Sequence, residues 1–169
     1  WAGAASSWPG DAAGSSVRTH RSTTSACASS LGRATPSTTI AFGSSALAAI
    51  VFGEPEAETY LSIMQRNAGD LVISAVTAVE AAVVIEAKQG PAARADLELL
   101  LSVLGVNVVS VDETQSSQAG AAWRRFGKGR HPAGLSFGDC FAYAVARVEG
   151  AALLYKGHDF AQTDITSAL

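Results

Sequence analysis

The stretch DLVISAVTAVEAAVVIEAKQ, residues 70–89, combines two local patterns. Its first part, Asp70-Leu71-Val72-Ile73, is a short apolar run typical of a buried strand. Its second part, Ala75–Gln89, has the length and composition of a helix, and Gly90-Pro91 ends it. A strand followed directly by a helix is the repeating unit of α/β proteins, so this stretch predicts that class.

The same alternation continues on both sides. Before the unit, Thr38–Phe42 predicts a strand ended by Gly43-Ser44-Ser45, followed by two helices. After it, the predicted elements are a helix at 91–104, a strand at 106–111, a helix at 112–126, a basic loop at 127–134, a helix at 137–149 and a strand at 151–155. Strands alternating with helices predict a three-layer α/β/α fold with a central, mainly parallel sheet covered on both faces.

Residues 1–37 differ from the rest of the chain. Ala, Ser, Thr and Gly fill 25 of these 37 positions, and Val17 and Leu31 are the only aliphatic residues larger than alanine. Such a segment cannot bury enough apolar surface to offset the entropy lost on folding. We therefore expect a disordered, low-complexity segment at 1–37 and one folded domain at 38–169.

The composition of the chain indicates in which cellular compartment the protein works. The formal net charge is −3, which is not typical of a protein that binds nucleic acid through a basic surface alone. With only two cysteines, Cys27 and Cys140, the chain has no disulfide framework. No run of 18 apolar residues predicts a membrane span, and no apolar secretory signal opens the chain. These features favour a cytoplasmic protein with no membrane partner.

Glu80 is the first candidate site residue. In the predicted helix it shares a face with an apolar stripe, which we expect to point into the core: Val76, Val83, Val84 and Ala87. A carboxylate on such a face needs a charged partner or a metal ion. The structural alternative is an ion pair with a buried arginine or a position at the rim of the core.

Two aspartates near the C-terminus are the other candidates. Asp139 lies three residues after Ser136, at the start of a helix, which is the spacing of a capping box and equally a position at the edge of the sheet. Asp159 follows the last strand, where an ordinary turn aspartate is the alternative. Asp164 is a competing acid that we expect to cap a local element.

Other motifs exclude several chemistries. The chain has no phosphate-binding P-loop, no Gly-x-Ser-x-Gly nucleophile motif and no zinc-ligand spacing. Acidic side chains remain as active-site material, and such hard oxygen ligands suit Mg²⁺ or Mn²⁺. One basic cluster either contacts phosphates or forms a solvated helix end: Arg124, Arg125, Lys128, Arg130 and His131.

From Ile40 onward, several short segments appear together in a fixed order. They are Ser44-Ser45-Ala46-Leu47, Glu54-Pro55-Glu56, Glu80 in its Ala/Val helix, Gly127-Lys128-Gly129-Arg130-His131, Gly138-Asp139-Cys140 and Leu153-Leu154-Tyr155-Lys156-Gly157 with Asp159-Phe160. This set resembles the VapC-type toxins of the PIN-domain family. The pair Gly-Lys-Gly-Arg-His and Gly-Asp-Cys is its most specific part.

The resemblance implies an endoribonuclease toxin of a type II toxin–antitoxin pair that uses Mg²⁺ or Mn²⁺. Glu80 and Asp139 match the family's helix acids, and Asp159 is the best match for the acid after the late strand, where His158 is a close neighbour. Ser45 matches a small hydroxyl residue that we expect to help hold the cofactor. We expect the three acids to converge at the carboxyl end of the sheet.

The resemblance also implies partners. They are an RNA substrate, a cognate antitoxin protein and a second copy of the chain. For the homodimer we expect an apolar patch on the first helices, formed by Leu47, Ile50 and Val51.

The sequence departs from the family at Gly43. The first-strand acid of the family falls at this position, and glycine has no side chain to bind a metal ion. We therefore expect weak or absent ribonuclease activity. The alternative function is that of a catalytically inactive PIN-fold protein that binds antitoxin or RNA without cleaving it.

Overall fold

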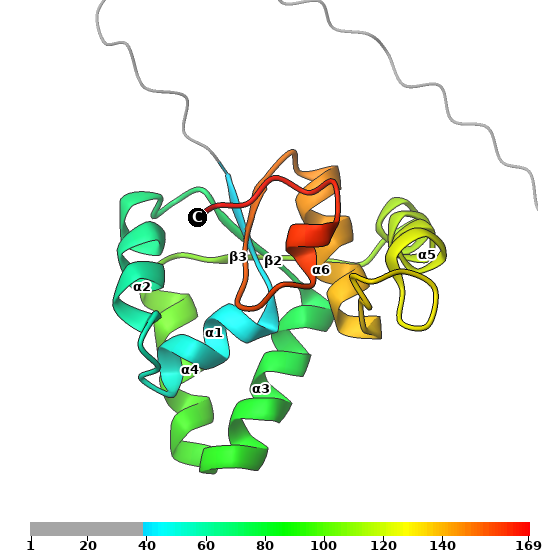
Figure 1. The fold of residues 1–169 in the computed structure, drawn as a ribbon. Helices are drawn as coiled ribbons and strands as arrows, with labels where there is room; N and C mark the ends of the chain where they lie inside the picture. Colours follow the sequence, from blue (N-terminus) through cyan, green and yellow to red (C-terminus); the bar gives the residue numbers. More distant parts are fainter. Residues whose placement is uncertain (1–38) are drawn as a thin grey trace, which may run out of the picture. The chain divides into compact units, whose positions relative to one another are not determined.

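The computed structural model describes residues 39–169, so the predictions for residues 1–37 and Thr38 lie outside the described residues. Four strands and six α-helices make up this part (Figure 1). In chain order they are β1 (Ile40–Phe42), α1 (Ser44–Val51), α2 (Ala57–Arg66), β2 (Leu71–Ser74), α3 (Ala75–Gln89), α4 (Pro91–Val103), β3 (Asn107–Val109), α5 (Glu113–Phe126), α6 (Phe137–Val148) and β4 (Ala152–Leu154). The predicted elements of the domain are thus present, with bounds shifted by a few residues.

The four strands form one sheet with the order β3-β2-β1-β4, and every neighbouring pair is parallel. Successive residues of a strand point to opposite faces. Ala41, Val72 and Leu153 therefore join a core with α5 and α6, whereas Phe42 and Ile73 join a second core with α1 to α4. The predicted three-layer α/β/α architecture is confirmed, and Figure 1 shows the two helix groups on opposite sides of the sheet.

The buried face of α3 differs from the predicted one. The fully covered residues are Thr77, Ala81 and Ile85, whereas Val83 is 61% exposed and Ala87 is exposed. The predicted stripe was wrong because α3 is rich in Ala and Val on every side, so apolar periodicity could not select one face. Packing of α3 against α1 and α4 makes the selection.

The predicted dimer patch on α1 is also wrong. Leu47 is fully buried, and Ile50 and Val51 pack against the same core. The structure adds one element that was not predicted, a short 3₁₀ helix η1 at Phe160–Gln162. Among the described residues, no helix is long and apolar enough to cross a membrane.

Candidate active site

The carboxyl ends of three adjacent strands lie together at one end of the sheet, which we call its carboxyl edge. Gly43 follows β1, Ser74 ends β2 and Tyr155 follows β4. These strands are neighbours and parallel, so their carboxyl ends lie side by side, where open α/β sheets bind ligands. The Gly43 N–H donates a hydrogen bond to the Leu154 carbonyl oxygen at 2.9 Å, which joins two of these ends directly.

Gly43 has room for a side chain. Its backbone angles, φ −84° and ψ 152°, are extended and suit any residue. A Cβ atom placed there would lie 3.6 Å from Ser45 Oγ, 3.6 Å from Tyr155 Cβ and 3.7 Å from Phe160 Cε2, which are ordinary contacts. Neither backbone strain nor crowding therefore requires glycine at the position where the family pattern has an acid.

Ser45 holds the loop that follows β4. Its Oγ accepts a hydrogen bond from the Lys156 N–H at 3.1 Å. Lys156 Nζ also contacts the carboxylates of Glu54 at 2.7 Å and Glu56 at 2.9 Å. The hydrogen bond from Lys156 lowers the pKa of Glu56, and the hydrogen bonds to both glutamates raise the pKa of Lys156. The charges of Glu54 and Glu56 are therefore neutralised by the ammonium group of Lys156.

Glu80 is half-buried and lies against the first turn of α6. A Cβ atom at Gly138 would overlap the Cδ and both carboxylate oxygens of Glu80. The carboxylate therefore occupies the space that a side chain at 138 would fill. Because Asp139 is the next residue, the fold brings these two predicted site residues to the same helix end.

Asp139 forms the capping box that its spacing predicted. Its Oδ2 accepts a hydrogen bond from the Ser136 N–H at 2.8 Å, and its own N–H donates to Ser136 Oγ at 3.2 Å. The structural alternative is thus confirmed as local geometry. The hydrogen bond from the Ser136 N–H engages one of the two carboxylate oxygens of Asp139.

Asp159 is exposed and occupies the N-cap position of η1, but its side chain makes no capping hydrogen bond. Within residues 39–169, no group of three or more His, Cys, Asp or Glu side chains is placed to hold a metal ion. The predicted convergence of Glu80, Asp139 and Asp159 is therefore not found. Asp159 lies on a loop, whose course the strand and helix pattern does not determine.

Asp164 does not cap a local element as predicted. It accepts a hydrogen bond from Tyr143 Oη at 2.6 Å and pairs with Arg125 Nη1 at 2.6 Å. The Tyr143 hydrogen bond is the main cause of its lowered pKa, and Arg125 adds to it. These partners lie 21 and 39 residues away in the sequence, beyond the reach of a local pattern.

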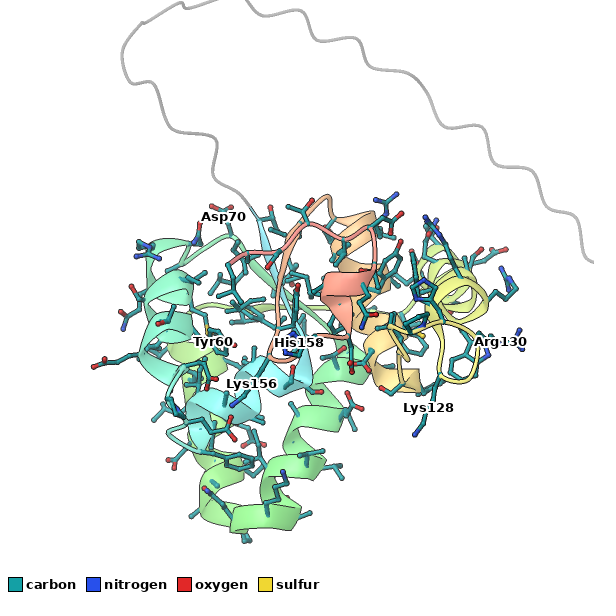
Figure 2. The ribbon with its side chains drawn as sticks, in the orientation of Figure 1. Tyr60, Asp70, Lys128, Arg130, Lys156 and His158 are labelled. Atoms are coloured by element: carbon teal, nitrogen blue, oxygen red, sulfur yellow. The ribbon has the colours of Figure 1, made fainter. Side chains whose placement is uncertain are left out.

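The basic cluster divides into two groups. Arg125 is paired with Asp164 and stacks on Phe126, and His131 Nδ1 accepts a hydrogen bond from the Ala133 N–H at 3.1 Å. Three exposed cations form no ion pair with any described residue: Arg124, Lys128 and Arg130. Lys128 and Arg130 lie on the loop after α5 (Figure 2). They remain available for an anionic partner.

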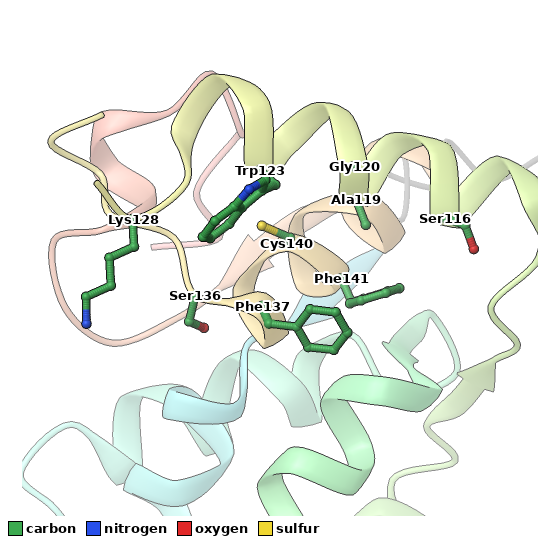
Figure 3. A pocket seen from close by; sticks show the side chains of 9 residues that line it. All are labelled: Ser116, Ala119, Gly120, Trp123, Lys128, Ser136, Phe137, Cys140 and Phe141. Atoms are coloured by element: carbon green, nitrogen blue, oxygen red, sulfur yellow. The ribbon is translucent and has the colours of Figure 1, made fainter. Parts of the chain in front are cut away.

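A groove of about 580 Å³ lies between α5 and α6. Trp123, Phe137 and Phe141 line it, with Lys128 at one end (Figure 3). The buried Cys140 thiol also lines it, and burial, with a contribution from Asp139, raises the pKa of this thiol to about 11. The thiol is therefore protonated at neutral pH and is not an activated nucleophile.

The fold is that of the PIN domain, whose family model matches residues 42–165. The chain belongs to the PIN-domain family. It is 42% identical over 123 residues to ribonuclease VapC30 of Mycobacterium tuberculosis, covering 73% of this chain and 93% of that protein. It is 45% identical over 125 residues to ribonuclease VapC of Mycolicibacterium smegmatis, covering 73% and 95%.

A solved structure supports the same fold. The VapC20 toxin of Mycobacterium tuberculosis, described as cleaving the sarcin-ricin loop, superposes with a TM-score of 0.63 at 19% identity. The match covers 75% of this chain and 96% of the toxin. At this identity the likeness establishes the fold and not the substrate.

Proposed function

We propose that this chain is an endoribonuclease toxin of a type II toxin–antitoxin pair, with activity weakened by Gly43. The observation that carries the proposal is the contact of the Glu80 carboxylate with Gly138, one residue from Asp139, at the carboxyl edge of the sheet. VapC ribonucleases with 40–45% identity over almost their whole length support the same function. We further propose a cognate antitoxin as partner and the cytoplasm as the place of action of this chain.

The donor set fits a divalent cation only in part. Glu80 and Asp139 offer two carboxylates at one helix end, and Mg²⁺ is commonly held by one or two carboxylates together with substrate phosphates. Asp159, on the loop after β4, remains the proposed third acid, and Ser45 the proposed hydroxyl residue of the site. A bound Mg²⁺ or Mn²⁺ would supply a water of lowered pKa and neutralise charge on the phosphate.

In this proposal the side chains divide into carboxylates that hold the cation, basic residues that bind RNA and glutamates that fix a loop. The positive end of the α6 dipole favours two carboxylates at its N-terminus. Lys128 and Arg130 are exposed and unpaired among the described residues, so they can hold the RNA backbone through its phosphates. Glu54 and Glu56, bound to Lys156, fix the β4 loop and take no part in the chemistry.

The second candidate function is binding of RNA or antitoxin without cleavage. It is favoured by glycine at position 43 and by the absence of a three-carboxylate group within residues 39–169. Both functions use the same fold, and they differ in whether the site holds a cation well enough to activate water.

The Gly43→Asp variant separates the two functions. A Cβ atom at position 43 meets only ordinary contacts, so we expect the variant to fold. It should bind Mn²⁺ about tenfold more tightly or better and cleave RNA with Mg²⁺, because hard cations depend on carboxylate count. The unaltered chain should cleave weakly or not at all. Adding Glu80→Gln or Asp139→Asn should abolish the gain. Mn²⁺ titration and an RNA cleavage assay measure both effects.

Ala87→Asp is the matched control, since it adds one carboxylate at an exposed position near the far end of α3. It should change neither Mn²⁺ affinity nor cleavage. If the unaltered chain cleaves RNA well and Gly43→Asp alters neither quantity, the site is placed wrongly. If Gly43→Asp cleaves RNA and the unaltered chain binds RNA without cleaving it, the unaltered chain has the binding function.

A further inference from the structure

Gly138 stands at a position where an added side chain would displace the end of another side chain. It is buried in the first turn of α6, between Phe137, which is exposed, and Asp139, which is half-buried. A Cβ atom there would overlap the whole carboxyl group of Glu80, which comes from the neighbouring helix α3. The conflict is therefore with one particular side chain, and that side chain is a proposed site residue.

Gly120 shows that a glycine in these helices is not generally required by packing. It is the other glycine within a described helix, and a Cβ atom there would meet only the Arg124 Nη1 atom, at 3.4 Å. That atom ends a flexible, exposed side chain and can move aside. Glycine is also a poor helix former, so local helix stability does not explain Gly138 either.

We propose that Gly138 is a positioning residue of the nuclease site. Its missing side chain lets the Glu80 carboxylate lie against the α6 backbone, one residue from Asp139, and any larger residue would displace it. The helix N-terminus then offsets part of the repulsion between the two carboxylates. This inference rests on the proposed function, because positioning has a purpose only if both carboxylates act together.

The contact itself is tested by a thermodynamic cycle that needs no activity. Gly138→Ala should lower the melting temperature of the full chain by about 4 °C or more, since the Glu80 carboxyl group must leave its place. In a Glu80→Ala background the same substitution should leave the melting temperature unchanged or raise it, because the space is then free and alanine favours the helix. Gly120→Ala, the matched control, should not lower it in either background.

Positioning is tested by Mn²⁺ titration and steady-state RNA cleavage in the Gly43→Asp chain, at a temperature where every variant is folded. Adding Gly138→Ala should weaken Mn²⁺ binding by about tenfold or more, as supporting-shell changes commonly do, and lower kcat more than it raises KM for RNA. Glu80→Asp, one methylene shorter, should recover part of the affinity in the Gly138→Ala chain, whereas Glu80→Gln should not. Gly120→Ala should leave affinity and kcat unchanged.

The outcomes distinguish the two proposals. Equal destabilisation by Gly138→Ala with and without the Glu80 side chain would overturn the contact. Unchanged Mn²⁺ affinity and kcat in a Gly138→Ala chain that shows the stability coupling would overturn positioning alone. If the Gly43→Asp parent neither binds Mn²⁺ nor cleaves RNA, the proposed function fails and the positioning role falls with it, while the cycle still reports the packing contact.

Discussion

At the scale of single residues, some acidic side chains form an ion pair with a lysine or arginine of the chain and others do not. Glu54 and Glu56 bind Lys156, and Asp164 binds Arg125. Glu80 and Asp139 form no ion pair with any residue from 39 to 169, and the Glu80 carboxylate, from α3, lies against the N-terminal turn of α6 that contains Asp139. A carboxylate without an internal cation is the kind that can bind an external one.

The Tyr143 hydroxyl group should stabilise the fold in a pH-dependent way. Its hydrogen bond is the largest cause of the lowered pKa of Asp164, so the stabilisation is present above the ordinary carboxyl value of 3.8 and is lost as pH falls through the lower folded value. Tyr143→Phe should cost about 1 kcal/mol of unfolding free energy at pH 7, a figure reduced for the partial exposure of Asp164.

Urea unfolding of both proteins between pH 7 and pH 2.5 measures this difference. It should shrink as the pH falls below about 4. A Tyr143→Phe chain that is equally destabilised at pH 7 and pH 2.5 would show that the hydroxyl acts through packing and not through the Asp164 charge.

At the scale of elements, α6 organises the site. Its N-terminal turn contains the capping box of Ser136 and Asp139, and Gly138, which has no side chain. The rest of the helix packs into the core on one face of the sheet. One helix thus sets the position of Asp139 directly and that of Glu80 by contact. Changes at its N-terminus should therefore affect both stability and the site.

Ser136→Ala should destabilise the domain by about 1 kcal/mol, because the Asp139 N–H loses its side-chain acceptor. Ser136→Thr keeps a hydroxyl acceptor and should lose less than half of that. Thermal unfolding followed by circular dichroism measures both. Equal losses for alanine and threonine would mean that the hydroxyl contributes no capping energy.

At the scale of the whole molecule, the exposed apolar surface lies on a different part of the fold from the predicted one. Phe137 is 72% exposed beside the groove between α5 and α6, and α3, which packs against α6, exposes Val79 and Val83. Exposed apolar residues on neighbouring helices are the material of interaction sites. We propose this surface, in place of the α1 patch, as the contact of the homodimer.

Phe137→Gln should weaken that dimer by about tenfold or more, since exposed aromatic side chains dominate such contacts. Val148→Gln is the matched control, because Val148 is exposed at the opposite end of the same helix. Sedimentation equilibrium over a range of concentrations measures the dissociation constant. A chain that is monomeric at high micromolar concentration would contradict the dimer, and equal weakening by both variants would contradict the surface.

The sequence by itself determined the class of fold and most of the element order. Short apolar runs alternate with helices that Gly and Pro end, and such a pattern can bury its apolar surface only as a sheet covered on both faces. The Ser136–Asp139 capping box was also predictable, because its two residues lie three apart. The ordered short motifs carried the family resemblance for the same reason, since each is local.

Only the tertiary structure decided which face of α3 is buried, where Glu80 lies and which acids are neutralised. The Ala/Val composition of α3 left its faces equivalent until α1 and α4 packed against it. Lys156 lies 102 residues from Glu54, and Gly138 meets Glu80 from another helix. These contacts depend on how elements pack, and no periodicity or spacing along one chain segment encodes them.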